Sequence, residues 1–239
     1  GSCQSSVEEQ FLLHKLSESI KAKTHIPGHF GEDDGLLLSA DRTPNLRGAL
    51  ATGLCKKYPV DNLKALGRQL DRGEIKTLFV VNEDVLALGV AEEQLKKAKV
   101  IYLGIHENQV SRLADVVLPG LAVFEKSGTF INRSFILQKF LQAVPGPVGL
   151  VPDYLLLSRI LNEVSGETSN FPTLESVWRE IGRLRSSCLN GVFFGEVNEQ
   201  GHKLDPGKLS DFPFVESKAL NFIRPKRKSL SRRPVGKKG

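Results

Sequence analysis

Apolar and polar residues alternate with the periodicity of a helix at the start of the chain. Over residues 7–20 (VEEQFLLHKLSESI), apolar side chains recur at the three- and four-residue spacing that places them on one face of a helix. These side chains are Phe11, Leu12, Leu16 and Ile20. Ser5 or Ser6 precedes the pattern with acids close behind, which is typical of a helix N-terminus. The sequence therefore predicts a helix over 7–20.

A second rhythm, of short apolar runs alternating with amphipathic segments, begins near residue 61. The predicted strands are KTLFVV (76–81), VIYLGI (100–105) and DVVLP (115–119). The predicted helices are DNLKALGRQLDRGE (61–74), VAEEQLKKA (90–98) and QVSRLA (109–114). Nearly unbroken apolar runs suit strands covered on both faces, and strands that alternate with helices pair in parallel. The predicted fold class is α/β, a doubly wound and mostly parallel sheet with an added C-terminal helical segment.

Outside this alternation the pattern predicts smaller elements. Leu36–Leu38 is expected to be a short buried run, and Asp41–Pro44 a turn that leads into a helix capped by Asn45. The predicted C-terminal elements are helices at 152–166 and 174–185 and a short strand at 191–197. Their aromatic residues Trp178 and Phe193-Phe194 are expected to pack in the core.

The Pro-Gly-Pro stretch at 145–147 separates a region of alternating predicted strands and helices from a mostly helical one. The predicted organisation is an α/β domain over 1–147, a helical extension with a short strand over 148–215, and a basic, disordered tail over 216–239. The sequence opens at Gly1 and contains no methionine, so we expect it to be a piece of a longer protein.

The formal net charge of +6 comes from the end of the chain. From Arg224 onward there are eight Lys or Arg residues and no acid, which leaves 25 basic and 27 acidic residues before that point. A basic tail can be a solvated terminus, or it can contact an acidic or anionic surface. Because no aromatic residues are interleaved with these charges, we do not expect nucleic-acid binding as the main function.

Composition argues against several other classes of protein. No run approaches about 18 consecutive apolar residues, and the N-terminus lacks the profile of a signal peptide. Cys3, Cys55 and Cys188 form no CxxC pair and the five histidines show no metal-binding spacing, so we expect no metal site in this chain. Neither GxGxxG nor GxxxxGK[ST] occurs, which removes the two best-defined phosphate-binding loops.

One continuous stretch, ADVVLPGLAVFEKSGTFINRSFILQ (114–138), carries a recognisable motif. Its order is Ala-Asp-x-Val-Leu-Pro, then a glutamate, then Gly-Thr-x-x-Asn, and a glutamine six residues on. This order resembles the molybdopterin oxidoreductase superfamily. Supporting stretches are Ser5–Leu16, ADRTPNLRGA (40–49) and IKTLFVVNEDVL (75–86). Within the superfamily the chain is most similar to the large iron-sulfur subunit of bacterial NADH-quinone oxidoreductase, respiratory complex I.

After Asn132 the stretch departs from the family pattern. Members that bind a molybdopterin guanine dinucleotide usually continue with Glu-Gly-Arg, where this chain has Ser134, Phe135 and Ile136. Phenylalanine and isoleucine offer no side-chain donor to a phosphate and crowd the backbone. Binding of the cofactor in the family manner is therefore disfavoured.

The resemblance implies a structural or assembly portion of the complex I large iron-sulfur subunit, in the arm that carries electrons from NADH toward quinone. This portion would have no catalytic residue, cofactor or metal of its own, while the parent assembly would hold iron-sulfur clusters and FMN and supply the partner subunits. It would lie peripherally on the cytoplasmic side of the inner membrane. Two alternatives stay open: a molybdenum or tungsten pterin-dependent oxidoreductase domain that binds molybdopterin guanine dinucleotide, and a nucleotide- or anion-binding module with a basic docking tail.

Eight residues would form what is left of the cofactor-binding edge. They are Asn82, Glu83, His106, Glu125, Gly128, Thr129, Asn132 and Gln138. Because ligands of open α/β sheets bind beyond the carboxyl ends of the strands, the first three are expected at such a crevice.

The other five residues follow the last predicted strand, and we expect them to have structural roles. Gly128 would permit a turn, Thr129 and Asn132 would satisfy backbone groups of the loop, and Gln138 would tie the returning strand. Glu125 and its neighbour Lys126 are expected to be an exposed, solvated pair with no catalytic role.

Overall fold

The computed structural model describes residues 2–32, 34, 36–56, 63–166, 171–185 and 187–208, and the predicted tail at 216–239 lies outside them. The helices in these ranges are α1 (Val7–Ser19), α2 (Leu46–Ala51), α3 (Lys64–Asp71), α4 (Glu92–Leu95), α5 (Gln109–Leu113), α6 (Asp153–Ser165) and α7 (Leu174–Ile181). The strands are β1 (Thr77–Val81), β2 (Lys99–Gly104), β3 (Val116–Pro119), β4 (Gly128–Ile131), β5 (Ile136–Phe140) and β6 (His202–Lys203). None of the helices described is long and apolar enough to cross a membrane.

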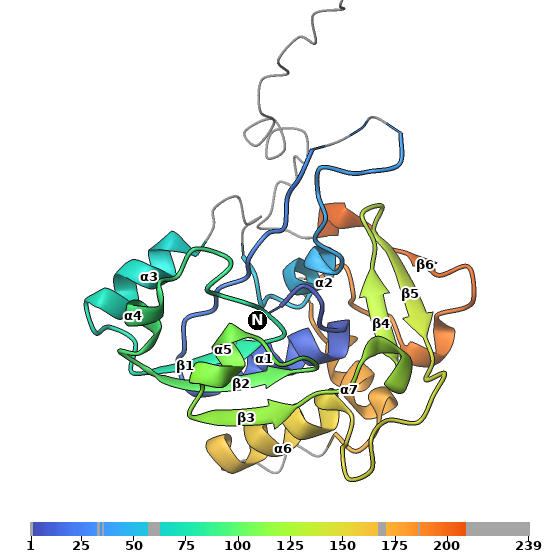
Figure 1. Cartoon of the computed structure of the whole chain (residues 1–239). Coiled ribbons are helices and arrows are strands. Elements are labelled where there is room, and N and C mark those ends of the chain that lie inside the picture. Colours follow the sequence, from blue (N-terminus) through green and yellow to red (C-terminus); the bar gives the residue numbers. More distant parts are fainter. Residues whose placement is uncertain are drawn as a thin grey trace, which may run out of the picture.

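Two three-stranded sheets organise the described part of the molecule (Figure 1). In the first, β1, β2 and β3 lie in that order and pair in parallel, which confirms the predicted α/β class. Alternate side chains of its strands enter two apolar clusters. Val81 and Leu103 pack with α1 and α6 on one face, and Val80 and Tyr102 pack with α3, α4 and α5 on the other. Burial on both faces explains the nearly unbroken apolar runs of these strands.

The second sheet is antiparallel, with the order β4-β5-β6. Helix α1 packs against α6, α7 and β4, so it lies between the parallel sheet and the second sheet (Figure 1). Ser6 caps α1 in a reciprocal pair with Glu9, as the sequence predicted. Helices α3 and α4 are shorter than the predicted segments 61–74 and 90–98, and residues 61 and 62 lie outside the described part of the chain.

Three smaller predictions are wrong. Leu36 and Leu37 are more than four-fifths exposed, because the N–H groups of Leu36–Leu38 donate to the Asp34 carboxylate and form a surface turn. The predicted strand at 191–197 instead contains a 3₁₀ turn at Phe194–Glu196. Trp178 and Phe194 are buried as expected, but Phe193 is 45% exposed beside that turn.

Asn45 does not cap α2, because its side chain is used elsewhere. Its Nδ2 donates to the Ser5 carbonyl at 2.8 Å, and its Oδ1 accepts the N–H of Ile131 at 2.8 Å. Asn45 thereby joins the segment before α1 to strand β4. Both the donor and the acceptor of this buried amide have partners, as buried polar groups normally do. The side chain is therefore not available to cap α2.

Candidate functional site

Asn82 is the first residue after β1, at the carboxyl end of the parallel sheet. Its φ is 50°, in the left-handed region that few residues other than glycine adopt, and its N–H donates to the Leu103 carbonyl at 2.7 Å. Its side-chain Oδ1 is buried and has no hydrogen-bond partner among the described residues. Buried polar atoms are nearly always paired. Asn82 therefore combines a left-handed backbone with a buried amide oxygen that no described residue pairs.

Glu83, by contrast, is buried and already paired. Its carboxylate accepts the Ser2 hydroxyl at 2.7 Å and contacts His29 Nε2 at 3.1 Å. The hydrogen bond to Glu83 raises the pKa of His29, against the opposing effect of burial. Glu83 thus joins the first residues of the chain to the end of β1.

His106 lies beyond β2 at the same edge and is exposed. Its backbone carbonyl accepts the Tyr102 hydroxyl at 3.2 Å, and the Asn108 amide donates to the same hydroxyl at 3.1 Å. These bonds fix the loop but leave the imidazole facing solvent. We call Asn82, Glu83 and His106, which follow the carboxyl ends of β1 and β2, the sheet edge.

The residues of the second motif lie along β4 and β5. Gly128 is within β4 and not in a turn as predicted. An added Cβ there would lie 3.0 Å from both Ser6 Cβ and Phe140 Cζ, so glycine is needed for close packing against the start of α1. Thr129 does not satisfy backbone groups of the loop as predicted, because its N–H and its hydroxyl both donate to the Glu8 carboxylate, each at 3.1 Å.

The turn between β4 and β5 is satisfied within the chain. Asn132 Oδ1 accepts the N–H groups of Ser134 and Ile136, and its Nδ2 donates to Gln138 Oε1. These contacts are the roles predicted for Asn132 and Gln138. Phe135 has φ 56° and its ring is buried in the core. It therefore occupies a left-handed position of the kind glycine favours, at the place where the family pattern has glycine.

Lys126 is not the exposed partner of Glu125 that the sequence suggested. Lys126 is only 5% exposed, and its Nζ lies 2.7 Å from Glu9 Oε1 and 2.6 Å from Asp153 Oδ2. Burial alone would lower the pKa of Lys126, but the two carboxylates outweigh it and raise the pKa well above its usual value. Glu125 instead accepts the N–H of Ala122 at 2.8 Å within the preceding 3₁₀ turn (Val123–Glu125).

The first turn of α1 supplies the buried acids of this network, which sequence reasoning missed. Glu8 accepts the Trp178 indole N–H at 2.7 Å in addition to the Thr129 bonds. Burial raises the pKa of both Glu8 and Glu9, and their hydrogen-bond and ionic partners oppose that shift. We call residues 126–138 and the first turn of α1 the closed hairpin.

No group of three or more His, Cys, Asp or Glu side chains within the described ranges could hold a metal ion. A family model described as molybdopterin oxidoreductase matches residues 13–163. The chain belongs to the molybdopterin oxidoreductase family. That match spans the parallel sheet, residues 126–138 of the closed hairpin and most of α6, so it includes the sheet edge as well.

Curated relatives of this molybdopterin oxidoreductase family chain include formate dehydrogenases. The F420-dependent formate dehydrogenase 1 and 2 alpha subunits of Methanococcus maripaludis are 30% and 28% identical over 117 residues. A putative formate dehydrogenase of Bacillus subtilis (YrhE) is 25% identical over 133 residues. These matches cover 46%, 46% and 54% of this chain, but only 17%, 17% and 13% of the relatives. The chain therefore spans less than a fifth of the length of these relatives.

The two parts of the site differ in how well they suit a pterin dinucleotide. In the closed hairpin Thr129, Asn132 and Gln138 have partners inside the chain, and Phe135 stands where the pattern has glycine. The sheet edge has an exposed imidazole at His106 and, at Asn82, a buried acceptor that no described residue pairs. A nucleotide presents amine or hydroxyl donors and phosphate oxygens, so the residues of the sheet edge fit one nucleotide half of such a cofactor.

Proposed function

We propose that this chain is a domain of a molybdenum- or tungsten-dependent pterin oxidoreductase of the formate dehydrogenase kind. In this proposal the sheet edge binds one nucleotide half of a pterin dinucleotide. The single observation that carries the proposal is the Oδ1 of Asn82, which is buried without a partner among the described residues, on a left-handed backbone at the carboxyl end of β1. Ligands of doubly wound sheets bind at that end, and strained residues concentrate at binding sites.

The roles of the individual residues follow from their chemistry. Asn82 Oδ1 would accept a hydrogen bond from the guanine or ribose of the nucleotide, and the His106 imidazole would contact its phosphates. Glu83 would act indirectly, because its bonds to Ser2 and His29 hold the chain at the end of β1. The cofactor, when bound, would supply the redox chemistry, while this chain supplies binding and orientation.

A second candidate is a structural portion of the large iron-sulfur subunit of NADH-quinone oxidoreductase, without a redox centre of its own. The observation that favours it is Phe135, which fills the glycine position of the cofactor-binding pattern with a buried ring. Under this reading the partners are the neighbouring subunits of the peripheral arm, at the cytoplasmic side of the inner membrane. The predicted contact of the basic tail with an acidic or anionic surface is compatible with both candidate functions.

The deciding measurement is the molybdenum, tungsten and pterin content of the protein purified from its native source. Near-stoichiometric metal and pterin are expected for the oxidoreductase. Iron-sulfur and flavin subunits that co-purify without either would instead support the structural portion of complex I.

A second experiment asks where a nucleotide binds on this chain. Calorimetric titration with guanosine diphosphate should give binding that Asn82→Ala weakens by about tenfold or more, as expected for about 1.4 kcal/mol from one lost hydrogen bond. Gln138→Ala is the matched control in the closed hairpin, where the side chain bonds Asn132. Loss of binding in Gln138→Ala but not in Asn82→Ala would move the site to the hairpin and contradict the proposal.

A further inference from the structure

Strand β1 lies at the edge of its sheet, and no strand in the described part of the chain pairs with its outer side. On its inner side, the Lys99 N–H donates to the Lys76 carbonyl and the Asn82 N–H to the Leu103 carbonyl. Because backbone groups alternate in direction along a strand, the N–H and C=O groups of Thr77, Phe79 and Val81 point away from β2.

A groove of about 630 Å³ follows this outer edge. All five residues of β1 line it, so it reaches around the strand from one face of the sheet to the other. Its other walls include the end of α1, the extended segment 21–27, Leu66 of α3, and Ile160 and Val164 of α6. Ile101 of β2 and Val116 and Leu118 of β3 also line it, so the groove continues from the edge across one face of the sheet. In Figure 1 the blue segment that follows α1 runs past the β1 side of the sheet.

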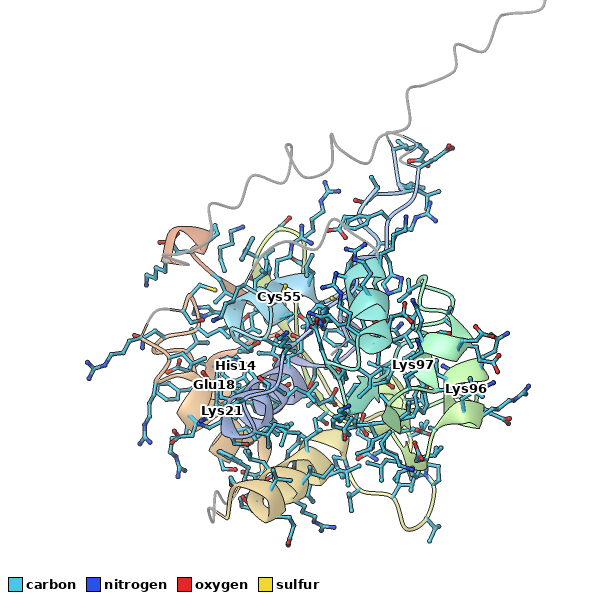
Figure 2. The ribbon with its side chains drawn as sticks, turned by 90° about the vertical axis from the view of Figure 1, so that its left-hand side faces the viewer. His14, Glu18, Lys21, Cys55, Lys96 and Lys97 are labelled. Carbon is cyan, nitrogen blue, oxygen red and sulfur yellow. The ribbon has the colours of Figure 1, made fainter. Side chains whose placement is uncertain are left out.

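Most side chains of the groove are apolar, while its rim is basic. Lys21, Lys23 and Lys76 line the groove, and the exposed acid beside them is Glu74, which pairs with Lys23 at 3.8 Å. In Figure 2 Lys21 lies at the end of α1, while Lys96 and Lys97 lie on the opposite side of the view. The excess of positive charge at the rim favours a ligand with negative charge at its ends.

We propose that this groove accepts an extended polypeptide segment that pairs with β1 as a fourth strand of the sheet. The segment would carry apolar side chains at alternate positions and acidic residues at its flanks. A compact apolar molecule would fill the volume but would leave the outward N–H groups of Phe79 and Val81 unpaired. Main-chain pairing with this edge strand satisfies them, since Thr77 is exposed and Phe79 is half-buried along the groove.

The test is amide hydrogen exchange on the full chain with a synthetic seven-residue peptide, threonine and valine in alternation between two terminal glutamates. At about ten times the Kd, the amides of Thr77, Phe79 and Val81 should exchange about tenfold more slowly. The amides of Leu78 and Val80, which point toward β2, serve as the internal control and should change little. Protection of all five amides alike, or none at saturating peptide, would overturn strand pairing.

Two pairs of variants separate the contributions of backbone and charge. Thr77→Pro removes one outward N–H at the first position of an edge strand, where proline is tolerated, and should weaken peptide binding by about tenfold, whereas Thr77→Ala should not. Lys76→Glu at the rim should weaken binding more than Lys96→Glu, which lies just after α4. Equal effects within either pair would contradict the proposal. Protection that grows with protein concentration without peptide would assign the groove to a second copy of this chain and would equally overturn it.

Discussion

The sheet edge and the closed hairpin carry parts of one family signature, but their polar groups find partners in opposite ways. In the closed hairpin Thr129, Asn132 and Lys126 bond to other residues of the chain. At the sheet edge the Asn82 amide oxygen is buried with no partner in the described part of the chain, and His106 faces solvent. Since a polar group with internal partners gains little from a ligand, a signature residue can persist for packing alone. Changes in the hairpin should therefore reduce stability, and changes at the edge should reduce binding.

The largest effect is expected from Lys126→Met. This change leaves Glu9 and Asp153 buried next to each other without their cation, which typically costs about 3–5 kcal/mol. The free energy of unfolding from urea denaturation at pH 7 measures it.

Lys97→Met is the matched control for this ion pair. Lys97 lies 2.7 Å from Asp71, but both side chains are more than two-fifths exposed, so its loss should cost less than about 1 kcal/mol. Similar losses in the two variants would mean that the buried network contributes no more than a surface ion pair.

The second prediction concerns the phenylalanine at the glycine position. Phe135→Ala should cost about 3–5 kcal/mol, because a buried ring is lost. Phe135→Gly should cost about 1 kcal/mol less than Phe135→Ala, since glycine adopts the left-handed backbone freely. Thermal or urea unfolding of both variants measures the difference.

Phe11 in α1 provides the control, because there the glycine variant should be less stable than the alanine variant. It is buried as deeply, but in an ordinary helical conformation, so Phe11→Gly should cost about 1 kcal/mol more than Phe11→Ala. If glycine is also the worse replacement at position 135, the backbone there is not strained.

The parallel sheet and α1 could be predicted from the sequence because their signals are local. Three apolar runs separated by amphipathic segments indicated β1, β2 and β3, and the serine and glutamate before an apolar face indicated the capped start of α1. The 191–197 strand was predicted wrongly, because a short apolar run does not show whether its backbone will find a partner strand. The turn at 36–38 was predicted wrongly because hydrophobicity alone does not reveal the carboxylate that organises it.

The candidate site was less accessible from the sequence, for a different reason. Lys126 was assigned to the surface because it follows Glu125, yet its partners are 117 positions before it in Glu9 and 27 after it in Asp153. No local pattern connects residues that far apart. The left-handed backbone of Asn82 and the environment of its amide are likewise properties of the folded chain.

The third prediction separates stability from binding at the sheet edge. Asn82→Gly relieves the left-handed backbone and removes a buried acceptor that no described residue pairs, so the free energy of unfolding should rise by about 1 kcal/mol. Guanosine diphosphate binding should fall at the same time. Asn82→Ala keeps the strain and should be less stable than Asn82→Gly by about 1 kcal/mol. A loss of stability in Asn82→Gly would mean that the amide has a structural partner and is not free for a ligand.

The smallest effect is a pH dependence that comes from His29, the partner of Glu83. The hydrogen bond to Glu83 raises the pKa of His29, so the protonated form of His29 is favoured in the folded state. Its contribution to stability is therefore fully present below the unfolded pKa of about 6.5 and is lost as pH rises through the folded pKa. Burial lowers the pKa of His14 and His25, which gives the opposite slope.

Comparison of wild type with His29→Gln isolates the contribution of His29, because the variant retains the other two histidines. Since His29 is partly exposed, the difference in the free energy of unfolding should be under about 1 kcal/mol. Urea unfolding should show this difference shrinking between about pH 6 and 8, as the imidazole loses its proton. A difference that grows over the same interval would mean that the pKa of His29 is lowered, like those of His14 and His25. It would contradict an ionic contact between His29 and Glu83.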